Sequence, residues 1–349
     1  MTKERIVYFD ILRVISCFLV IMVHVSSNPI STASPSTFDY QIGNFYNTLA
    51  ISAPAIFIML SGAIFLRPEY WKMPLKKLWK KYILRLIVSF AFWSCLYTLI
   101  IWIPYYSFTI DTVKLYFLEV ITAPPMYHLW FIPMLISIYM ILPVLGPAFN
   151  DKRNCKYYLA LFILLQLLIP TILNFDFEHK AILQGLYGKI PYLLFVGHVG
   201  YFILGYYLSI ENSSKKLRSI LYVLGALGLL LAVGIDGYLS IQQDTSVRFL
   251  DDIFSINIFL FASAVFVAFR HIPWKTNKFT NIVSTLSKLT FGIYLIHVLI
   301  MDKVFETCTS LCTLPAIIWI PVITTITFVI STAIIWIVYK IPVINKYII

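Results

Sequence analysis

Residues 7–26 read VYFDILRVISCFLVIMVHVS, and this stretch decides how the rest of the chain is interpreted. At ~1.5 Å of rise per residue, a helix of this length crosses the ~30 Å hydrocarbon core of a bilayer. The stretch nevertheless carries Asp10, Arg13 and His24. An ionisable side chain at membrane depth costs on the order of 3 kcal/mol, so it persists mainly where it has a partner or a function. We therefore expect the polar side of this helix to face other helices.

The three ionisable residues share one side of the predicted helix. Arg13 and His24 are eleven positions apart, and at ~100° per residue they return to within ~20° of the same face, three turns on. Asp10 lies one turn before Arg13, close enough to pair with it. The spacing predicts a polar stripe with an arginine towards one end and a histidine towards the other.

The composition of the whole chain is that of a membrane protein. Of its 349 residues 60% are hydrophobic and 12% are charged, whereas soluble domains have about 25% charged residues. Apolar runs recur to the end, so we expect a single transmembrane domain over residues 1–349 with no soluble domain. The first run is too long and too polar on one face for a cleaved signal peptide, and we expect it to be retained.

Hydropathy predicts an all-α integral membrane protein with about ten transmembrane helices, at residues 7–26, 47–66, 82–103, 128–148, 157–174, 190–209, 217–235, 250–269, 282–302 and 314–338. Of the 27 Lys and Arg residues, 19 fall in the loops and ends on one side of this arrangement. The positive-inside rule then places both termini in the cytoplasm. The net charge of +11 follows from this topology, and it does not indicate a nucleic-acid partner.

Two loops have contrasting compositions. Residues 28–44 are rich in Ser, Thr and Pro and lack Lys and Arg, as expected of an external loop. The first internal loop carries Lys76, Lys77, Lys80 and Lys81 on one face of a short helix. This face indicates contact with anionic lipid and fixed orientation, or a landing site for a phosphorylated cytoplasmic substrate. Spacing alone favours the lipid contact.

Other motifs point to structure. The five cysteines form no metal-type pair, and Cys308 and Cys312 are expected to be unpaired thiols; we predict no metal site. No glycine-rich phosphate or dinucleotide motif occurs. Gly200 and Gly205 lie within a predicted span, where small residues indicate close helix packing.

The predicted topology brings histidines together. His24, His128 and His297 all fall towards the outer side of their spans, and His198 lies about halfway along its own. A single histidine in a span is more often a packing residue than a catalyst. The shared face of Arg13 and His24 favours function here, because histidine is the usual general base near neutral pH.

Five segments resemble the acyltransferase-3 family of bacterial membrane acyltransferases, which O-acylate cell-surface glycans and related molecules. The resemblance covers nearly the whole chain in order. It rests on Arg13 and His24 with their ten-residue separation after Tyr8-Phe9-Asp10, and on Ala53-Pro54-Ala55-Ile56-Phe57-Ile58-Met59-Leu60-Ser61-Gly62, Lys80-Lys81-Tyr82-Ile83-Leu84-Arg85-Leu86, His128-Leu129-Trp130-Phe131 and Phe291-Gly292-Ile293-Tyr294-Leu295-Ile296-His297.

This resemblance implies ten transmembrane helices in the bacterial cytoplasmic membrane. It implies an acyl-CoA donor, usually acetyl-CoA, from the cytoplasm, and a sugar hydroxyl as acceptor, often on a lipid-linked or exported glycan. His24 matches the essential histidine of the family, Arg13 its first-helix arginine and Arg85 the arginine of its third-helix segment. The chain departs from the family at Ala53-Pro54-Ala55 and at Lys80-Lys81, where many members have a Gly-Val-Pro-type start and arginines.

We therefore predict an O-acetyltransferase that modifies a polysaccharide or related glycan, with no permanently bound cofactor. Lys76, Lys77, Lys80 and Lys81, together with Arg85, would hold the CoA phosphates, since charge-assisted bonds to phosphate are strong. Asp10 would orient the donor or stabilise the polar stripe. His24 would act as general base on the acceptor hydroxyl, or accept the acyl group itself. The further candidates for substrate binding are His128, Trp130 and Tyr294, on the acceptor side, and His297.

Two alternatives remain open on the sequence. A small-molecule transporter would share the many spans and the buried charge, although no matching pair of broken helices marks two inverted repeats. A structural partner of polysaccharide-assembly proteins would tolerate substitution of the polar stripe if packing were kept.

Overall fold

The computed structural model describes residues 6–102, 109–122, 126–189 and 197–349, and all regular structure in these ranges is helical. Seven helical runs are long and apolar enough to span a membrane. They are α1 (Val7–Thr32), α2 (Phe38–Ala50) with α3 (Ser52–Phe65), α5 (Leu75–Leu78) with a π-helical turn (Trp79–Ile83) and α6 (Leu84–Trp102), α10 (Lys152–Phe162) with a second π-helical stretch (Ile163–Leu168) and α11 (Ile169–Leu173), α14 (Lys215–Gln243), α16 (Lys278–Thr307) and α17 (Ala316–Val338).

An eighth candidate span is bent. A 3₁₀ turn (Tyr127–Trp130) and α8 (Phe131–Met140) meet α9 (Leu142–Ala148) at 62°. Pro143 explains the break, because proline has no N–H to continue the hydrogen-bond ladder of α8. The remaining helices are α4 (Pro68–Trp71), α7 (Ile110–Thr122), α12 (Lys180–Gly188), α13 (Val199–Ile210), α15 (Ile256–His271), a 3₁₀ turn (Thr309–Thr313) and α18 (Pro342–Tyr347).

The structure thus gives seven spans, or eight with the bent pair, where the sequence predicted about ten. The difference lies at the predicted spans 190–209 and 250–269, whose helices are α13 and α15. These have 12 and 16 residues, fewer than the ~20 that a full crossing needs. Part of the first of these predicted spans, residues 190–196, lies outside the described residues.

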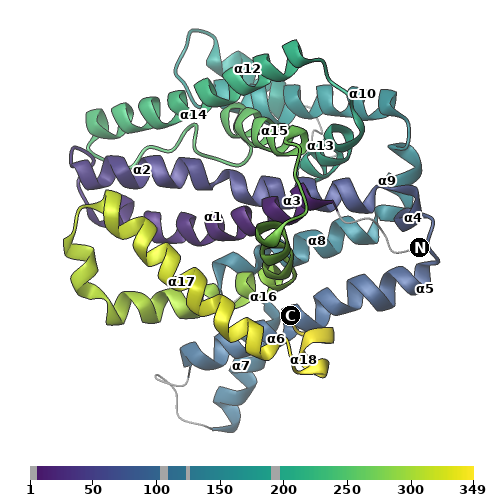
Figure 1. Cartoon of the computed structure of the whole chain (residues 1–349). Helices are drawn as coiled ribbons and strands as arrows, with labels where there is room; N and C mark the ends of the chain where they lie inside the picture. Colours follow the sequence, from purple (N-terminus) through teal and green to yellow (C-terminus); the bar gives the residue numbers. More distant parts are fainter. Residues whose placement is uncertain (1–5, 103–108, 123–125, 190–196) are drawn as a thin grey trace.

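Helix α1 occupies the middle of the bundle (Figure 1). It packs against α2, α3, α16 and α17, while α14 and α15 lie together on one side of the molecule. Asp10 and Ser16 of α1 are buried. The polar side of the first helix therefore faces protein, as its spacing predicts, and its neighbours come from both ends of the chain.

The predicted external loop at residues 28–44 is wrong in extent. α1 continues to Thr32 and α2 begins at Phe38, where Thr37 caps the helix by accepting a bond from Tyr40 N–H. The polar side chains of this stretch are instead used inside the bundle: Asn44 donates to the carbonyl oxygen of Val233 on α14 at 3.0 Å. Hydropathy alone underestimates a helix whose polar residues bond to neighbouring helices.

Helices α3 and α13 approach through glycines. A methyl group placed on Gly62 would lie 1.7 Å from the carbonyl oxygen of Phe202, and one placed on Gly205 would lie 1.9 Å from that of Met59. Only glycine allows this separation, because the obstructing atoms are backbone. The predicted packing role of Gly205 is thereby confirmed.

Gly205→Ala should lower the free energy of unfolding by about 1–3 kcal/mol or more, because overpacking forces the two backbones apart. Gly234→Ala is the matched control, since no atom lies within 4 Å of the added methyl group on α14. Thermal unfolding in detergent measures both variants. Equal melting temperatures for the two would contradict the tight α3–α13 contact.

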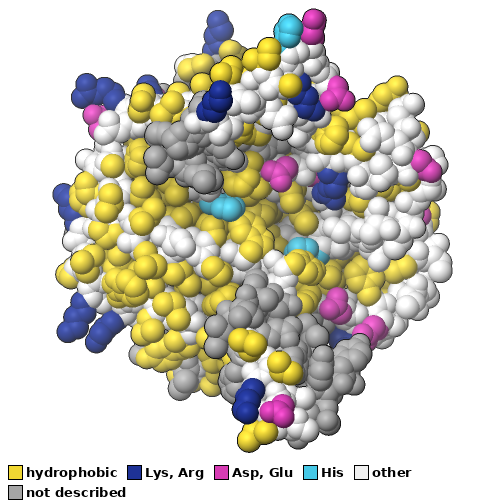
Figure 2. All heavy atoms as spheres, turned by 180° about the vertical axis from the view of Figure 1, so that it is seen from behind, with side chains coloured by type: hydrophobic (Ala, Val, Ile, Leu, Met, Phe, Trp, Pro, Cys, Tyr) yellow, Lys and Arg dark blue, Asp and Glu magenta, His cyan; other side chains and the backbone are white. Residues whose placement is uncertain are grey.

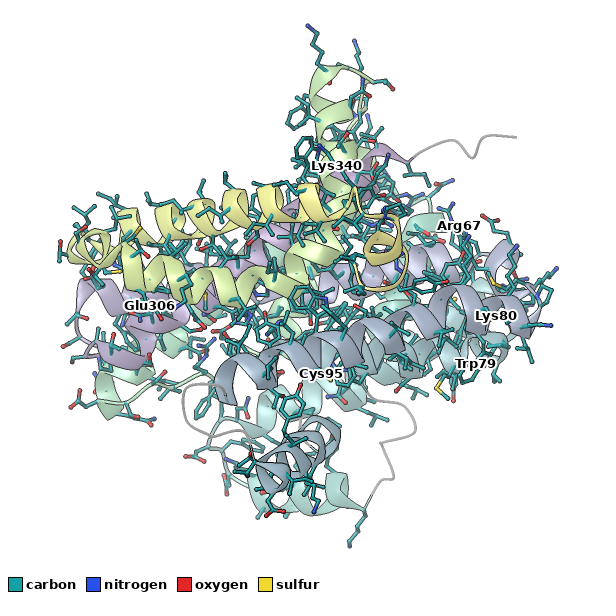
Figure 3. All side chains as sticks on the ribbon, turned by 90° about the horizontal axis from the view of Figure 1, so that it is seen from below. Arg67, Trp79, Lys80, Cys95, Glu306 and Lys340 are labelled. Carbon is teal, nitrogen blue, oxygen red and sulfur yellow. The ribbon has the colours of Figure 1, made fainter. Side chains whose placement is uncertain are left out.

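The surface agrees with a multi-pass membrane protein. Hydrophobic side chains cover much of the face shown in Figure 2, and Lys and Arg lie mainly towards its edges. Figure 3 places Arg67 and Lys80 towards one end of the bundle and Glu306 towards the other. We call the first of these the basic end. All five cysteines are free, as predicted for Cys308 and Cys312.

Candidate active site

A cavity of about 300 Å³ lies between α1, α3, α8 and α16. Most of its wall is apolar, and a few polar groups point to it from different helices. The lining residues are Arg13, Val20, Val23, His24, Ile51, Pro54, Phe57, Ser61, His128, Trp130, Phe131, Leu135, Thr290, Phe291 and Tyr294. A mainly apolar pocket with a small number of polar groups is the usual form of a small-molecule site.

Arg13 marks the end of the cavity nearer the basic end, where Phe9, one turn earlier on α1, lies under the Arg67 guanidinium. Its Nη1 lies 3.5 Å from Asp10 Oδ1, which also accepts a 2.6 Å bond from Ser287 Oγ on α16. The predicted pairing of Asp10 with Arg13 is therefore present. Asp10 is 4% exposed, while the Arg13 side chain keeps a third of its surface accessible. The Asp10 carboxylate thus orients the Arg13 side chain and links α1 to α16 through Ser287.

His24 marks the other end of the cavity, within a cluster of three imidazoles. Its ring centroid lies 5.3 Å from that of His297, with the planes 22° apart, and the His297 ring lies 5.1 Å from that of His128. At ~1.5 Å per residue, Arg13 and His24 are ~16 Å apart along α1. The structure thus brings together the three histidines that the predicted topology places on one side.

The His297 ring is held in one orientation. Its side chain is fully buried, and Nδ1 lies 2.6 Å from the carbonyl oxygen of Tyr294. A carbonyl oxygen can only accept, so Nδ1 carries the proton and Nε2 keeps its lone pair. Within the described part of the chain, Nε2 has no hydrogen-bond partner. The Tyr294 hydroxyl in turn donates to the carbonyl oxygen of His128, which joins α16 to the start of α8.

Sequence reasoning missed Ser287 and Tyr127. Ser287 bonds to Asp10, and the Tyr127 ring lies 4.9 Å from that of His24. Ser287 belongs to a repeat that the sequence does contain: residues 287 and 294, and likewise 290 and 297, are seven apart and therefore on one face of α16. That heptad spacing could have identified the stripe. Nothing in the spacing of Tyr127 predicts its contact with a histidine of another helix.

The wall near His24 continues into a group of aromatic rings. Trp130 lines the cavity and is 38% exposed, and its ring lies 5.0 Å from that of His198. The His198 ring also lies 5.1 Å from that of Phe254. His198 immediately precedes the short helix α13, and Phe254 lies two residues before the short helix α15. The segments that lead into these two helices therefore lie beside the cavity wall at Trp130.

Three of the predicted phosphate-binding residues lie outside the cavity wall. Lys80 and Lys81 are exposed at the basic end (Figure 3). Arg85 donates to the carbonyl oxygen of Ile349, and its guanidinium carbon lies 5.9 Å from the ring centroid of Phe291. Since Phe291 lines the cavity, a single side chain separates Arg85 from it.

Nothing in the described ranges resembles a metal centre: no three His, Cys, Asp or Glu side chains converge in a way that suits a metal ion. The cavity instead combines a cation, the imidazoles of His24 and His128, with His297 packed against both, and an apolar wall. This combination can hold a negatively charged or carbonyl-bearing group near Arg13 and move a proton near His24.

A model of a protein family described as an acyltransferase domain matches residues 6–340, nearly the whole chain. No curated protein and no solved structure matches the chain. The match covers every helix that lines the cavity. The chain belongs to the acyltransferase-3 family and is a multi-pass membrane acyltransferase.

Proposed function

We propose that this protein moves an acetyl group from cytoplasmic acetyl-CoA to a hydroxyl of a cell-surface or lipid-linked glycan, in the cytoplasmic membrane of a bacterium. The observation that carries the proposal is the single cavity with Arg13 at one end and His24 at the other. The ~16 Å between them is close to the length of an extended pantetheine arm. A donor whose phosphates stay at the basic end can therefore present its thioester to His24.

The chemistry needs one base and one path for a proton. His24 takes the proton from the acceptor hydroxyl as its oxygen attacks the thioester carbonyl. The carbon–sulfur bond then breaks, and the proton passes to the leaving thiolate, so that free CoA and the acyl ester are the products. In the alternative order, His24 accepts the acyl group first and CoA leaves before the acceptor arrives. Both orders use the same cavity and the same histidine.

The surroundings of His24 favour transfer of the acyl group to an alcohol rather than to water. Val20, Val23 and Phe57 make the adjoining wall apolar, and His297 packs parallel to the His24 ring. A site that excludes bulk water suppresses hydrolysis of the thioester. The buried Nε2 of His297 is a second acceptor site beside the base, where a hydroxyl of the acceptor can donate.

Trp130 is the candidate contact for a sugar ring. Its indole is both part of the cavity wall and more than one-third exposed. Large aromatic faces provide extensive apolar contact with little loss of conformational freedom. The Trp130, His198 and Phe254 rings form a continuous aromatic surface that leads away from His24.

At the other end, the exposed Lys80 and Lys81 together with Arg85 offer positive charge to the CoA phosphates. Lysine binds phosphate as a point charge, whereas arginine can make two parallel bonds. We therefore assign Arg85 the more specific contact, and the lysines a role in attracting the donor.

A transporter is the second candidate, and the bent pair α8–α9 together with the short helices α13 and α15 favours it, because broken helices often form solute sites in transporters. Proteoliposomes of wild-type protein, supplied with radiolabelled acetyl-CoA on the basic side and glycan lipid acceptors, distinguish the two. We expect label on the acceptor and release of free CoA in equal amounts. Uptake of an unmodified solute with no CoA release would refute the proposal.

A further inference from the structure

Three hydrogen-bond donors on α6 form a stripe that holds another part of the chain. Arg85, Ser89 and Trp93 are four residues apart, so they lie along one side of the helix. Ser89 Oγ donates to the carbonyl oxygen of Ile348 at 2.8 Å, and Trp93 Nε1 donates to the same oxygen at 3.2 Å. Arg85 donates to the carbonyl oxygen of Ile349.

The segment held by this stripe, residues 342–349, includes α18; we call it the strap. The end of the chain lies beside α6 and α18 in Figure 1. Ile349 is 3% exposed, and its Cβ lies 3.3 Å from the position that a Cβ on Gly292 of α16 would take. The strap is thus inserted between α6 and α16 and does not merely rest on the surface.

Arg85 is not fully used by the strap. Its Nε is buried and has no hydrogen-bond partner among the described residues. The bond to the strap comes from Nη2 of Arg85, whereas a phosphate can accept two parallel bonds from a guanidinium. The arginine that is best placed to hold the donor is therefore occupied by a ligand that matches it incompletely.

The occupied position adjoins the cavity at two points. The Arg85 guanidinium lies over Phe291, which is part of the cavity wall. Further along α6, the ring of Trp93 lies 6.0 Å from that of Tyr97, and Tyr97 lies 5.1 Å from His128. The stripe that holds the strap therefore adjoins the cavity wall at Phe291 and, through Tyr97, at His128.

We propose that the strap is an autoinhibitory element that competes with the phosphate of the acyl-CoA donor for Arg85, while Ser89 and Trp93 hold it in place. The inference rests on the proposed function, because it needs a phosphate-bearing donor at Arg85. When the donor arrives, the Ile349 carbonyl leaves the guanidinium and the bonds from Ser89 and Trp93 to Ile348 break. Weakening those two bonds therefore favours the donor, although neither residue touches it.

The test measures the KM for acetyl-CoA in proteoliposomes that hold the protein with residues 1–349. We expect Ser89→Ala with Trp93→Phe to lower KM at least about threefold while kcat is unchanged, since a net hydrogen bond contributes about 0.5–1.5 kcal/mol. Ser94→Ala is the matched control: Ser94 is buried on the same helix, and its hydroxyl has no partner in the described ranges. An unchanged or raised KM in the double variant would contradict competition between the strap and the donor.

A crosslinked variant tests the same idea if the double variant does not fold. Cysteines at positions 292 and 349 would have their Cβ atoms about 3.3 Å apart, close to the separation in disulfides, and Ile335→Ala makes room for the first of them. Oxidation should then abolish turnover, and a reductant should restore it. The same variant with Ile349 kept is the control, and oxidation should not affect it. Equal turnover of the oxidised and reduced forms would contradict the proposal.

These experiments distinguish failure of the strap proposal from failure of the proposed acetyl transfer. If wild-type protein turns over acetyl-CoA but neither the KM of the double variant nor the turnover of the crosslinked variant changes, autoinhibition by the strap is refuted and the proposed function is not. If wild-type protein shows no acetyl-CoA turnover, the proposed function is refuted. Autoinhibition by the strap is then refuted too, because it requires this donor.

Discussion

His24→Ala should lower the rate of acyl transfer by at least about 100-fold, because it removes the only side chain at that end of the cavity that we assign as general base, a role that contributes about 10²–10⁴-fold in enzymes. The loss should appear in kcat, since the donor phosphates bind at the opposite end. Initial rates of acyl transfer at saturating acetyl-CoA measure it.

The control for this substitution is His179→Ala. His179 lies before α12, and its side chain is 72% exposed, so its removal should leave the rate unchanged. Melting temperatures of both variants show whether each is folded. Transfer at the wild-type rate by folded His24→Ala protein would exclude this histidine from the chemistry.

Arg13→Ala should lower kcat/KM by about 10–100-fold, because a hydrogen bond to a charged group contributes about 1.5–3 kcal/mol. Arg13→Lys should recover only part of the loss, since an ammonium group cannot reproduce the paired donors of a guanidinium. The dependence of initial rate on acetyl-CoA concentration measures each variant. Arg153→Ala, at a side chain that is 90% exposed on α10, should behave as wild type.

Arg13 also pairs with the buried Asp10, so stability must be separated from function. Breaking a buried ion pair on one side is destabilising. The variant that combines Asp10→Asn with Arg13→Ala removes both charges, and it should melt above Arg13→Ala alone yet stay as poor in catalysis. Recovery of activity in this double variant would show that Arg13 acts only by neutralising Asp10.

The polar side of α1 could be predicted because it depends only on spacing within one helix. Asp10, Arg13 and His24 are placed by the geometry of a regular helix, and the structure buries that side between α3 and α16 as expected. Ser287 could not be predicted as the partner of Asp10. Its contact depends on how α16 packs against α1, and residues 277 positions apart carry no local signal of it.

Span lengths and loop extents were harder to predict. Hydropathy treats any apolar run as a crossing, so it assigns α13 and α15 the same status as α14, although both are too short. It also assigned residues 28–44 to a loop, because it does not register that Gln41 and Asn44 donate to carbonyl oxygens of α14. Arg85 was predicted from the family resemblance as a phosphate-binding residue, and its contact with residue 349 could not be foreseen because it depends on the path of the last helix.

We place the donor thioester in the cavity between Arg13 and His24, and photolabelling with a CoA thioester whose acyl group carries a diazirine tests this placement. We predict label on residues of the wall near His24, such as Val20 and Val23, and loss of this label when acetyl-CoA is added in excess. Label confined to residues outside the cavity, or label that acetyl-CoA does not displace, would contradict the account.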